Sequence, residues 1–387
     1  MDAHLLEIQK RLIGFDTTSR NSNLEMAGFI AETLRALGFS AELLPGGEDG
    51  KANVFATLGP PDQGGLMLAG HMDVVPVDGQ DWSTDPFELT QREGRLYGRG
   101  TTDMKSFIAL CLAAAGELRG ARLARPLHLA FTYDEEVGCN GAEELMQALV
   151  ARGGPLPAWG VIGEPTGFQV HRMHKGYRAV EVLVRGVEGH SSMPDRGANA
   201  IACMGRVLEQ VARVTEECRG RRSLEEHFEI PYTTLSVGTI QGGSAINIIP
   251  NHCALALEYR FLPTEDPDYV FRQLEGHISE VLRPEFKKQH PEADIDIRVT
   301  QHKPPMMLEP GSEVERAVLE IAGRNAASAA PYYTEGAIYN QAGIPTVVCG
   351  PGDIGQAHRP NESISVEQME QGLEYVRRLI TRFCRGG

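Results

Sequence analysis

Short apolar runs alternate with helical patterns in the first half of the chain, and this alternation restricts the fold more than any other feature. The runs at 65–70 (GLMLAG), 127–131 (LHLAF) and 159–163 (WGVIG) are apolar throughout, as strands buried on both faces are. The segments 104–118 and 141–151 between them have helical patterns. Strands that alternate with helices predict an α/β fold with a mostly parallel sheet covered by helices on both faces.

The pattern changes near residue 177. The segment 177–186 (YRAVEVLVRG) alternates apolar and polar residues, which is typical of an antiparallel strand with one exposed face. The elements expected after it are a helix, two strands, a helix and a strand, at 196–217, 233–240, 253–261, 267–283 and 294–300. The resulting order, βαββαβ, is that of a ferredoxin-like unit.

We therefore expect a discontinuous domain that carries the chemistry, formed by 1–176 and 302–387, with a ferredoxin-like domain of residues 177–301 inserted into it. Helix and strand patterns alternate again after the insert, with an apolar run at 344–350 (IPTVVCG) before a closing helix. The exposed alternating strands of the insert could pair with a second copy at a sheet edge. This pairing predicts a homodimer in which the insert serves as a lid and dimerisation domain.

The composition argues against several other kinds of function. The formal net charge is −15, from 37 basic and 52 acidic residues, and such a surface repels a phosphate backbone, so no nucleic-acid partner is expected. No apolar run approaches the ~20 residues that span a membrane, and the N-terminal residues (MDAHLLEIQK) do not have the pattern of a signal peptide. The seven cysteines include no CxxC pair, which indicates reduced thiols and a cytoplasmic protein.

Potential metal ligands follow the apolar runs. The residues found there are His71, Asp73, Glu135, Glu136, Glu164 and His358. Asp103 stands at the start of the helix expected at 104–118. Because ligands of open parallel sheets bind outside the carboxyl ends of the strands, these side chains should meet at one edge of the sheet. Histidines and carboxylates without a thiolate suit Zn²⁺, Co²⁺ or Mn²⁺.

Three of these residues leave alternatives open. His71 and Asp73 are two residues apart, so on an extended chain they point the same way, and Asp73 could hold the second imidazole nitrogen and select the tautomer that binds metal. The alternative for Asp73 is a helix cap or a surface acid. For Glu135 and Glu136 the alternative is a solvated acidic turn. If they do serve a metal site, their spacing does not decide which one binds the metal.

Several motifs taken together resemble the dinuclear-zinc M20 amidohydrolase and aminopeptidase family. They are GHMDVVP, GRGTTDMKS, the paired glutamates, GEPT and AHRPNE, and they cover the chain end to end. The resemblance implies that Asp103 bridges two divalent metal ions, with zinc expected first and cobalt or manganese as alternatives. It implies that His71 and Glu164 complete the coordination of one ion, and that Glu136 and His358 complete the coordination of the other.

The resemblance also implies the chemistry of amide hydrolysis. Two adjacent metal ions lower the pKa of a shared water toward neutrality and polarise an amide carbonyl. In this family pattern Glu135 is the general acid/base that takes the proton of the water and passes it to the leaving amine. The peptide bond after Asp103 is expected to be cis. Ser106 stands where the family commonly has glycine, which puts the local helix packing in question.

Three residues of the insert are implied as substrate contacts. His190 is similar to the lid histidine that stabilises the oxyanion, often from the partner subunit, whereas the residue pattern alone would favour a surface histidine. Asn247, in GGSAINIIP, resembles a further lid contact. Arg260 would form a bidentate pair with a substrate carboxylate. The alternative for Arg260 is an ion pair on the sheet surface.

Three stretches indicate which amide is cleaved. The segments 79–100, 174–192 and 346–362 are most similar to the branch of the family that hydrolyses N²-acetyl-L-ornithine to ornithine and acetate, in arginine biosynthesis. The ammonium of such a substrate needs an acid, for which Glu335 is the candidate, and a helix-start glutamate is its alternative role. The alternative functions are succinyl-diaminopimelate desuccinylase, a broader N-acyl-amino-acid deacylase, or a non-catalytic scaffold or dipeptide-binding protein that keeps the fold and the metal.

Overall fold

The chain folds into two compact units in the computed structural model, which describes residues 2–47, 50–221 and 227–385. The first unit consists of Met1–Met173, Met307–Ser328 and Thr334–Gly387. The second unit consists of His174–Met306 and Ala329–Tyr333. None of the helices in the described ranges is both long enough and apolar enough to cross a membrane.

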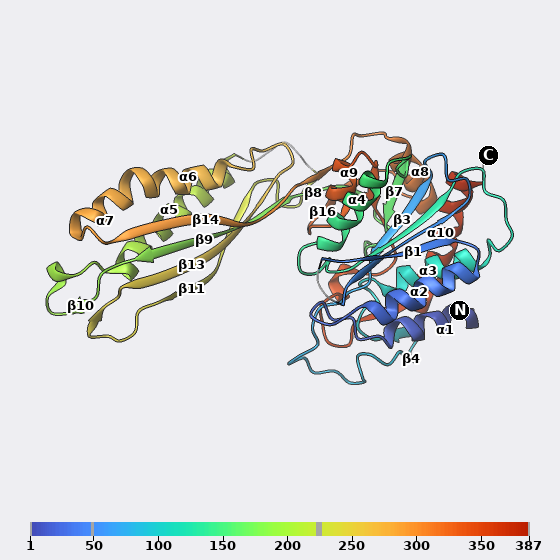
Figure 1. The fold of residues 1–387 in the computed structure, drawn as a ribbon, viewed down its shortest axis with the longest axis horizontal. Coiled ribbons are helices and arrows are strands. Elements are labelled where there is room, and N and C mark those ends of the chain that lie inside the picture. The colour runs from blue at the N-terminus through green and yellow to red at the C-terminus, as the bar shows by residue number, and fades with distance from the viewer. Residues whose placement is uncertain (1, 48–49, 222–226, 386–387) are drawn as a thin grey trace. The chain divides into compact units, whose positions relative to one another are not determined.

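The first unit is built around a mixed sheet (Figure 1). Its strands follow the order β1 (Ser40–Pro45), β2 (Ala52–Leu58), β6 (Leu127–Thr132), β3 (Leu66–His71), β7 (Trp159–Ile162), β17 (Thr346–Val348), β8 (His171–His174) and β15 (Met306–Met307), with β16 (Ser328–Ala330) paired to β8. The four strands from β6 to β17 are parallel, whereas β1–β2, β2–β6 and β17–β8 are antiparallel pairs. The predicted sheet is therefore confirmed, with its parallel part at the centre.

Helices cover this sheet because its central strands are apolar on both sides. Every residue of β3, β6 and β7 is buried, and successive side chains of a strand point to opposite faces, so both faces must be covered. The helices of this unit are α1 (Ala3–Ile13), α2 (Leu24–Ala36), α3 (Lys105–Gly116), α4 (Asn140–Arg152), α8 (Glu313–Ala322), α9 (Gly336–Gln341) and α10 (Val366–Cys384). The helices expected at 104–118 and 141–151 are present as α3 and α4.

A small antiparallel sheet joins two distant segments of the first unit. Its strands are β4 (Thr90–Arg92), β5 (Arg95–Tyr97) and β18 (Ser363–Ser365). Ser363 pairs with Tyr97 in this sheet. Residues just outside the pair, Arg99 and Glu362, are thereby brought within hydrogen-bonding distance.

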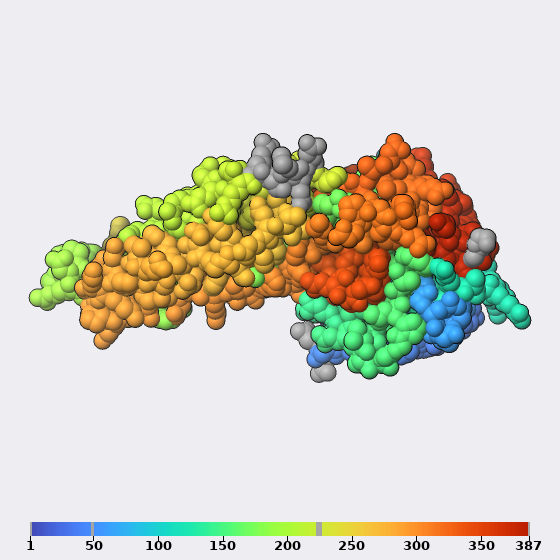
Figure 2. All heavy atoms as spheres, turned by 90° about the horizontal axis from the view of Figure 1, so that it is seen from above, coloured from blue at the N-terminus to red at the C-terminus, as the bar shows by residue number. Residues whose placement is uncertain are grey.

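The second unit has the predicted βαββαβ order. Its sheet follows the order β11 (Thr234–Gly242), β13 (His252–Phe261), β9 (Gly176–Arg185) and β14 (Asp294–Lys303), and all pairs are antiparallel. Its helices are α5 (Ala200–Gly220), α6 (Tyr269–His277), the π-helical turn η2 (Ile278–Leu282) and α7 (Arg283–Gln289). The strict alternation of buried and partly exposed residues along most of β9 places one face of the sheet against the helices. The helices α6 and α7 form part of the surface of this unit in Figure 2.

Candidate metal centre

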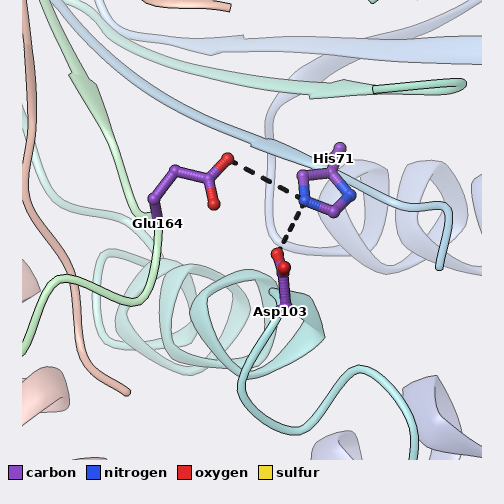
Figure 3. A group of neighbouring side chains, drawn as sticks. All are labelled: His71, Asp103 and Glu164. Atoms are coloured by element: carbon purple, nitrogen blue, oxygen red, sulfur yellow. Dashed lines mark hydrogen bonds and ion pairs between the residues drawn. The ribbon is translucent and has the colours of Figure 1, made fainter. Parts of the chain in front are cut away.

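The five predicted metal ligands lie in two groups that share one residue. One group consists of His71, Asp103 and Glu164, and the other of Asp103, Glu136 and His358. The ligand atoms within each group lie within 4.8 Å of one another. Figure 3 shows the first group, in which Nε2 of His71 is 3.0 Å from Oδ1 of Asp103 and 3.9 Å from Oε1 of Glu164.

The two carboxylate oxygens of Asp103 point to different histidines. Oδ1 faces His71, whereas Oδ2 is 3.3 Å from Nε2 of His358. The same nitrogen of His358 is 3.1 Å from Oε2 of Glu136. A carboxylate that offers one oxygen to each of two neighbouring groups has the arrangement that a bridge between two metal ions requires.

The strand ends of the central sheet bring most of these side chains together. His71 is the last residue of β3, and Glu164 follows the end of β7 by two residues. Glu136 lies in the turn after β6. Because β6, β3 and β7 are adjacent and parallel, their carboxyl ends meet at one edge, as expected for a ligand site in an open α/β sheet.

Two glycines allow helix α3 to approach this edge closely. A Cβ at Gly70 would lie 2.7 Å from Cε of Met104, and a Cβ at Gly163 would lie 2.0 Å from the ring of Phe107. Each glycine directly precedes a candidate ligand. A side chain at Gly163 would clash with a buried ring and push the start of α3, and with it Asp103, away from the ends of the strands. At Gly70 the flexible end of Met104 would have to move.

The carboxylate of Asp73 organises the other side of the centre. Nδ1 of His71 lies 3.0 Å from the backbone carbonyl of Asp73 and 3.5 Å from its Oδ1, so Nε2 is directed toward Asp103. The Asp73 carboxylate also accepts hydrogen bonds from Oγ of Ser19 at 2.7 Å and from the backbone N–H of Glu135 at 3.0 Å. Burial opposes the ionisation of Asp73, but the contacts with His71, Ser19 and Glu135 lower its pKa.

Glu135 and Glu136 lie in a tight turn, because the chain has left the strand at Thr132. Asp134 has a φ of 57°, a conformation that non-glycine residues rarely adopt. The backbone N–H of Glu136 donates to Asp73 at 3.3 Å, next to the bond from Glu135. The alternation of side chains along a strand therefore does not separate these two glutamates, and both can serve one site.

A buried lysine supports the same turn. Nζ of Lys51 donates to Oδ1 of Asp134 at 2.7 Å and also to the backbone carbonyl of Ser19. Ser19 in turn donates to Asp73. The sequence offers no local signal for this role, because Lys51 lies 83 positions before Asp134 in the chain.

The charges of the centre suggest bound cations. Burial, reinforced by repulsion from neighbouring carboxylates, raises the pKa of Glu135, Glu136 and Glu164. Hydrogen bonds to Asp103 and Glu136 raise the pKa of His358 to about 10. So many buried carboxylates cannot all ionise beside two imidazoles alone, whereas divalent cations would balance them. Imidazole and carboxylate donors without a thiolate suit Zn²⁺, Co²⁺ or Mn²⁺.

Glu362 was not among the predicted site residues, although it stands in the motif AHRPNE. Its Oε1 accepts hydrogen bonds from the backbone N–H groups of Thr102 and Asp103, at 2.7 and 3.0 Å, and its Oε2 accepts from Arg99 at 2.6 Å. The bond after Asp103 is cis, as the resemblance implied. The final acid of that motif was the available signal for this role.

The departure from the family pattern at Ser106 is accommodated in the helix. Its hydroxyl donates to the backbone carbonyl of Thr101 and accepts a hydrogen bond from Nε2 of Gln9 at 2.8 Å. Ser106 is buried, and its polar atom is satisfied by these two contacts. The serine therefore fits the packing of α3 at this position.

Glu335 lies at the start of α9 with only 1% of its surface exposed. Its Oε1 accepts a hydrogen bond from Oγ1 of Thr132 at 2.5 Å, and its Oε2 accepts one from the hydroxyl of Tyr339 at 2.9 Å. Burial raises the pKa of Glu335. Thr132 ends β6 directly before the turn that carries the paired glutamates, so Glu335 lies beside the centre.

The second unit contains the other three candidates, of which His190 and Asn247 lie on neighbouring loops. The short strands β10 (Gly189–His190) and β12 (Ile248–Ile249) pair, and the backbone N–H of Ser191 donates to the carbonyl of Asn247 at 3.2 Å. Nδ1 of His190 accepts from the backbone N–H of Ser192 at 3.2 Å. A nitrogen that accepts from a backbone N–H carries no proton, so in the neutral imidazole the proton is on Nε2, which can donate.

Arg260 lies on β13 and pairs with its neighbour. Its Nε is 3.2 Å from Oε1 of Glu258, and its guanidinium lies over the ring of Tyr177 at 5.2 Å from the centroid. About a third of the side chain is exposed. This contact is the ion pair on the sheet surface that the sequence left as the alternative. A role in substrate binding stays a prediction.

Comparison with known proteins shows the relatives of the chain. The sequence profile described as Peptidase family M20/M25/M40 matches residues 67–382. The chain is 38% identical over 380 residues to an acetylornithine deacetylase of Myxococcus xanthus, covering 97% of this chain and 96% of that protein. It is 36% identical over 370 residues to an acetylornithine deacetylase of Proteus mirabilis strain HI4320, and the match covers 95% of this chain and 92% of that protein.

A solved structure shares the fold of the whole chain. A tripeptidase from Staphylococcus aureus superposes with a TM-score of 0.77 and 22% sequence identity, covering 98% of this chain and 97% of that one. At this level of identity the likeness concerns the fold alone.

Proposed function

Because the chain belongs to peptidase family M20/M25/M40, we propose that it is a metal-dependent deacylase, acting on N²-acetyl-L-ornithine to release L-ornithine and acetate. Similarity at 36–38% identity to two acetylornithine deacetylases over nearly the full length supports this substrate. The observation that carries the chemistry is the position of Asp103, whose two oxygens face different histidines. The reaction belongs to arginine biosynthesis, in the cytoplasm.

The proposed centre holds two divalent cations. His71, Asp103 and Glu164 would hold one, and Asp103, Glu136 and His358 the other. Zinc fits this donor set best, and cobalt and manganese are the alternatives. When bound, the pair of ions lowers the pKa of a shared water and polarises the amide carbonyl.

Glu135 would serve as the general acid/base of the reaction. Its backbone is held by Asp73, and burial raises the pKa of its side chain, which suits a group that must both accept and return a proton. Glu135 would take a proton from water and deliver it to the nitrogen of the leaving amine. Asp73 would keep the His71 tautomer and the turn in place.

Residues of the second unit would bind the substrate. Nε2–H of His190 would donate to the oxyanion, in keeping with the acceptor role of its Nδ1. Asn247, on the adjoining loop, would contribute a further contact. Arg260 would exchange Glu258 for the substrate carboxylate. The exposed edge strand β11, with Val237 and Ile240 at its surface, supports a homodimer through this unit.

The test of the function is a metal-free sample assayed against a panel of acetyl-, succinyl- and formyl-amino acids. Activity should be lost on removal of metal and return with Zn²⁺ or Co²⁺, and acetylornithine should have the highest kcat/KM. Activity in a fully metal-free sample would contradict the proposed mechanism. A preference for a succinyl substrate would instead favour a desuccinylase, and equal rates across the panel a broader deacylase.

Glu335 is the proposed partner of the substrate ammonium. Its two oxygens already accept hydrogen bonds from Thr132 and Tyr339, so the ammonium would have to approach a carboxylate that is otherwise covered. The Glu335→Gln variant tests this role through the ratio of kcat/KM for acetylornithine to that for acetylmethionine. An unchanged ratio would restrict Glu335 to a structural role at the start of α9.

A further inference from the structure

The loop that carries His358 has an unfavourable local conformation. His358 and Asn361 have φ values of 63° and 58°, in the left-handed region that is uncommon for residues other than glycine, although histidine and asparagine adopt it more readily than most. Such a conformation persists only where surrounding contacts determine it. The contacts that hold this loop come from distant parts of the first unit.

One contact comes from Gln80. Its Nε2 donates to the backbone carbonyl of His358 at 3.0 Å. Its Oε1 accepts from Nη2 of Arg99 at 2.6 Å and from Nε1 of Trp82 at 3.0 Å. Because the amide nitrogen can only donate and the oxygen only accept, these three contacts determine the orientation of the Gln80 side chain.

Ser83 holds Asn361, since its backbone N–H and its hydroxyl both donate to Oδ1 of Asn361, at 2.9 and 2.6 Å. A further contact comes from Arg99, of which only 1% is exposed. Nη1 of Arg99 donates to the backbone carbonyl of Arg359 at 3.3 Å and to Oε2 of Glu362 at 2.6 Å. The second oxygen of Glu362 accepts from the backbone N–H of Asp103 at 3.0 Å. Arg99 thus connects the backbone of Asp103, through Glu362, with the backbone of His358, through Gln80.

The contact from Gln80 reaches only one of the two candidate metal positions, because His358 belongs to a single group. The contact from Arg99 through Glu362 also reaches Asp103, which both groups share. His71 ends β3 and Glu164 follows β7, so the central sheet supports both of them. His358 follows the short helix η3 (Ile354–Gln356) and lies in a loop between β17 and β18. We propose that Gln80 and Arg99 are positioning residues that determine the metal affinity of the group formed by Asp103, Glu136 and His358. The proposal rests on the metal centre put forward under the proposed function.

The experiment is a titration of metal-free protein with Co²⁺, followed by visible absorption and by equilibrium dialysis. Wild-type protein should bind two equivalents. The Gln80→Leu variant should bind one equivalent with unchanged affinity and the other with affinity about 10–100-fold lower, the usual effect of losing a partner outside the ligand shell. Gln80 is only half-buried, so its replacement leaves the fold intact, which circular dichroism checks.

Three further variants make the assignment specific. His358→Ala removes one ligand, so the Co²⁺ absorption that it weakens identifies the equivalent bound by the group containing His358. Gln80→Leu must weaken the binding of this same equivalent. Arg99→Lys keeps the positive charge but loses the planar group that donates to both Gln80 and Glu362, so it should weaken the metal equivalent bound by His358. Because Glu362 also supports the shared Asp103, this variant should weaken the other equivalent to a smaller extent. Gln63→Leu is the matched control, because Nε2 of Gln63 also donates to a backbone carbonyl, that of Ala124 at 3.2 Å. Gln63 precedes the amino end of β3, whereas the metal centre lies at the carboxyl end of that strand.

The outcomes separate this proposal from the proposed function. If wild-type protein binds two equivalents and Gln80→Leu binds both with unchanged affinity, the positioning role is wrong. Equal weakening of both equivalents overturns it too, because a general loss of structure would then explain the result. If wild-type protein itself binds fewer than two equivalents, the dinuclear centre is wrong, and the positioning role fails with it.

Discussion

The backbone N–H of Glu135 donates to the side-chain carboxylate of Asp73 at 3.0 Å. Asp73 also faces Nδ1 of His71, through its backbone carbonyl and its carboxylate. One buried acid therefore orients a candidate metal ligand on β3 and the turn after β6 that carries the candidate base. The geometry of the centre depends on this contact between two adjacent strand ends.

Replacement of Glu135 by glutamine should lower kcat by roughly 10²–10⁴-fold, the usual contribution of a general base, and leave the metal content unchanged. The amide keeps the shape of the side chain but cannot take up a proton. Steady-state kinetics and metal analysis of the purified protein measure the two quantities. The exposed Glu25, in the first turn of α2, provides a control as Glu25→Gln.

The same measurement on Glu136→Gln decides the division of roles between the two glutamates. We expect this variant to lose metal from the group that contains His358. If Glu135→Gln loses metal whereas Glu136→Gln retains it, the roles are reversed, as the spacing in the sequence permits.

Replacement of Asp73 by asparagine should weaken metal binding and lower activity by about 10–100-fold. The carboxylate accepts from Ser19, Glu135 and Glu136, and the amide nitrogen of asparagine cannot accept at all. Competition with a chelator measures the affinity. The control is Asp78→Asn, which removes an exposed carboxylate paired with Arg20. Equal affinities for Asp73→Asn and wild type would show that the Asp73 carboxylate does not support the centre.

Replacement of Lys51 by methionine should lower the free energy of unfolding of the first unit by about 3–5 kcal/mol, because it removes the cation that faces the buried carboxylate of Asp134. Urea denaturation followed by tryptophan emission is a suitable measurement. The two tryptophans of the chain, Trp82 and Trp159, both belong to this unit. The double variant Lys51→Met/Asp134→Asn should recover part of the loss.

An exposed ion pair provides the control for Lys51. Arg152 and Glu42 lie 2.7 Å apart with 39% and 49% of their side chains exposed, and such pairs contribute at most about 1 kcal/mol. Arg152→Met should therefore have a much smaller effect than Lys51→Met. Similar losses in the two variants would contradict the importance of the buried pair.

His128 should make the first unit sensitive to acid. Burial lowers its pKa to about 4, and its Nδ1 lies 2.9 Å from Oγ1 of Thr57. An unfolded histidine takes up a proton near pH 6.5, whereas the folded one does so only near pH 4, so stability is present above pH 6.5 and is lost as the pH falls toward 4. The loss over this range is of the order of 3 kcal/mol, from the pKa difference of about 2.5.

The measurement is the free energy of unfolding of metal-free protein between pH 7 and pH 4, for wild type and for His128→Gln. The variant should show a shallower decline, because its side chain does not titrate. Metal-free protein is used so that the loss of ligated metal at low pH does not contribute. Parallel curves for the two proteins would show that His128 does not determine the acid sensitivity.

Much of the candidate site could be predicted from the sequence because its ligands follow directly after strands. The apolar runs predict β3, β6 and β7, and residues just beyond buried parallel strands gather at one edge of the sheet. His71 and Glu164 are therefore placed by local sequence and by the topology it predicts. Asp103 and His358 lie outside those three strands, but the sequence pattern also placed them near this edge, at the start of the helix expected at 104–118 and after the apolar run 344–350. Their roles as bridging and terminal ligands came from the family resemblance.

The sequence could not decide between the two readings of Arg260. A bidentate contact with a substrate and an ion pair on the sheet surface both fit an arginine on an alternating strand. The structure places it beside Glu258 and over Tyr177, which are its available neighbours on the sheet. Such a choice depends on which side chains surround the position in three dimensions.

The sequence by itself determined the alternation of strands and helices, the βαββαβ order of the second unit and the residue types of the centre, because these follow from hydrophobic periodicity and from local motifs. Only the tertiary structure decided what holds the ligands in place. Asp103 and Glu362 are 259 positions apart, and Gln80 and His358 are 278 apart. A hydrogen bond between such distant residues leaves no periodic trace in the chain, because packing of the folded elements alone brings its donor and acceptor together.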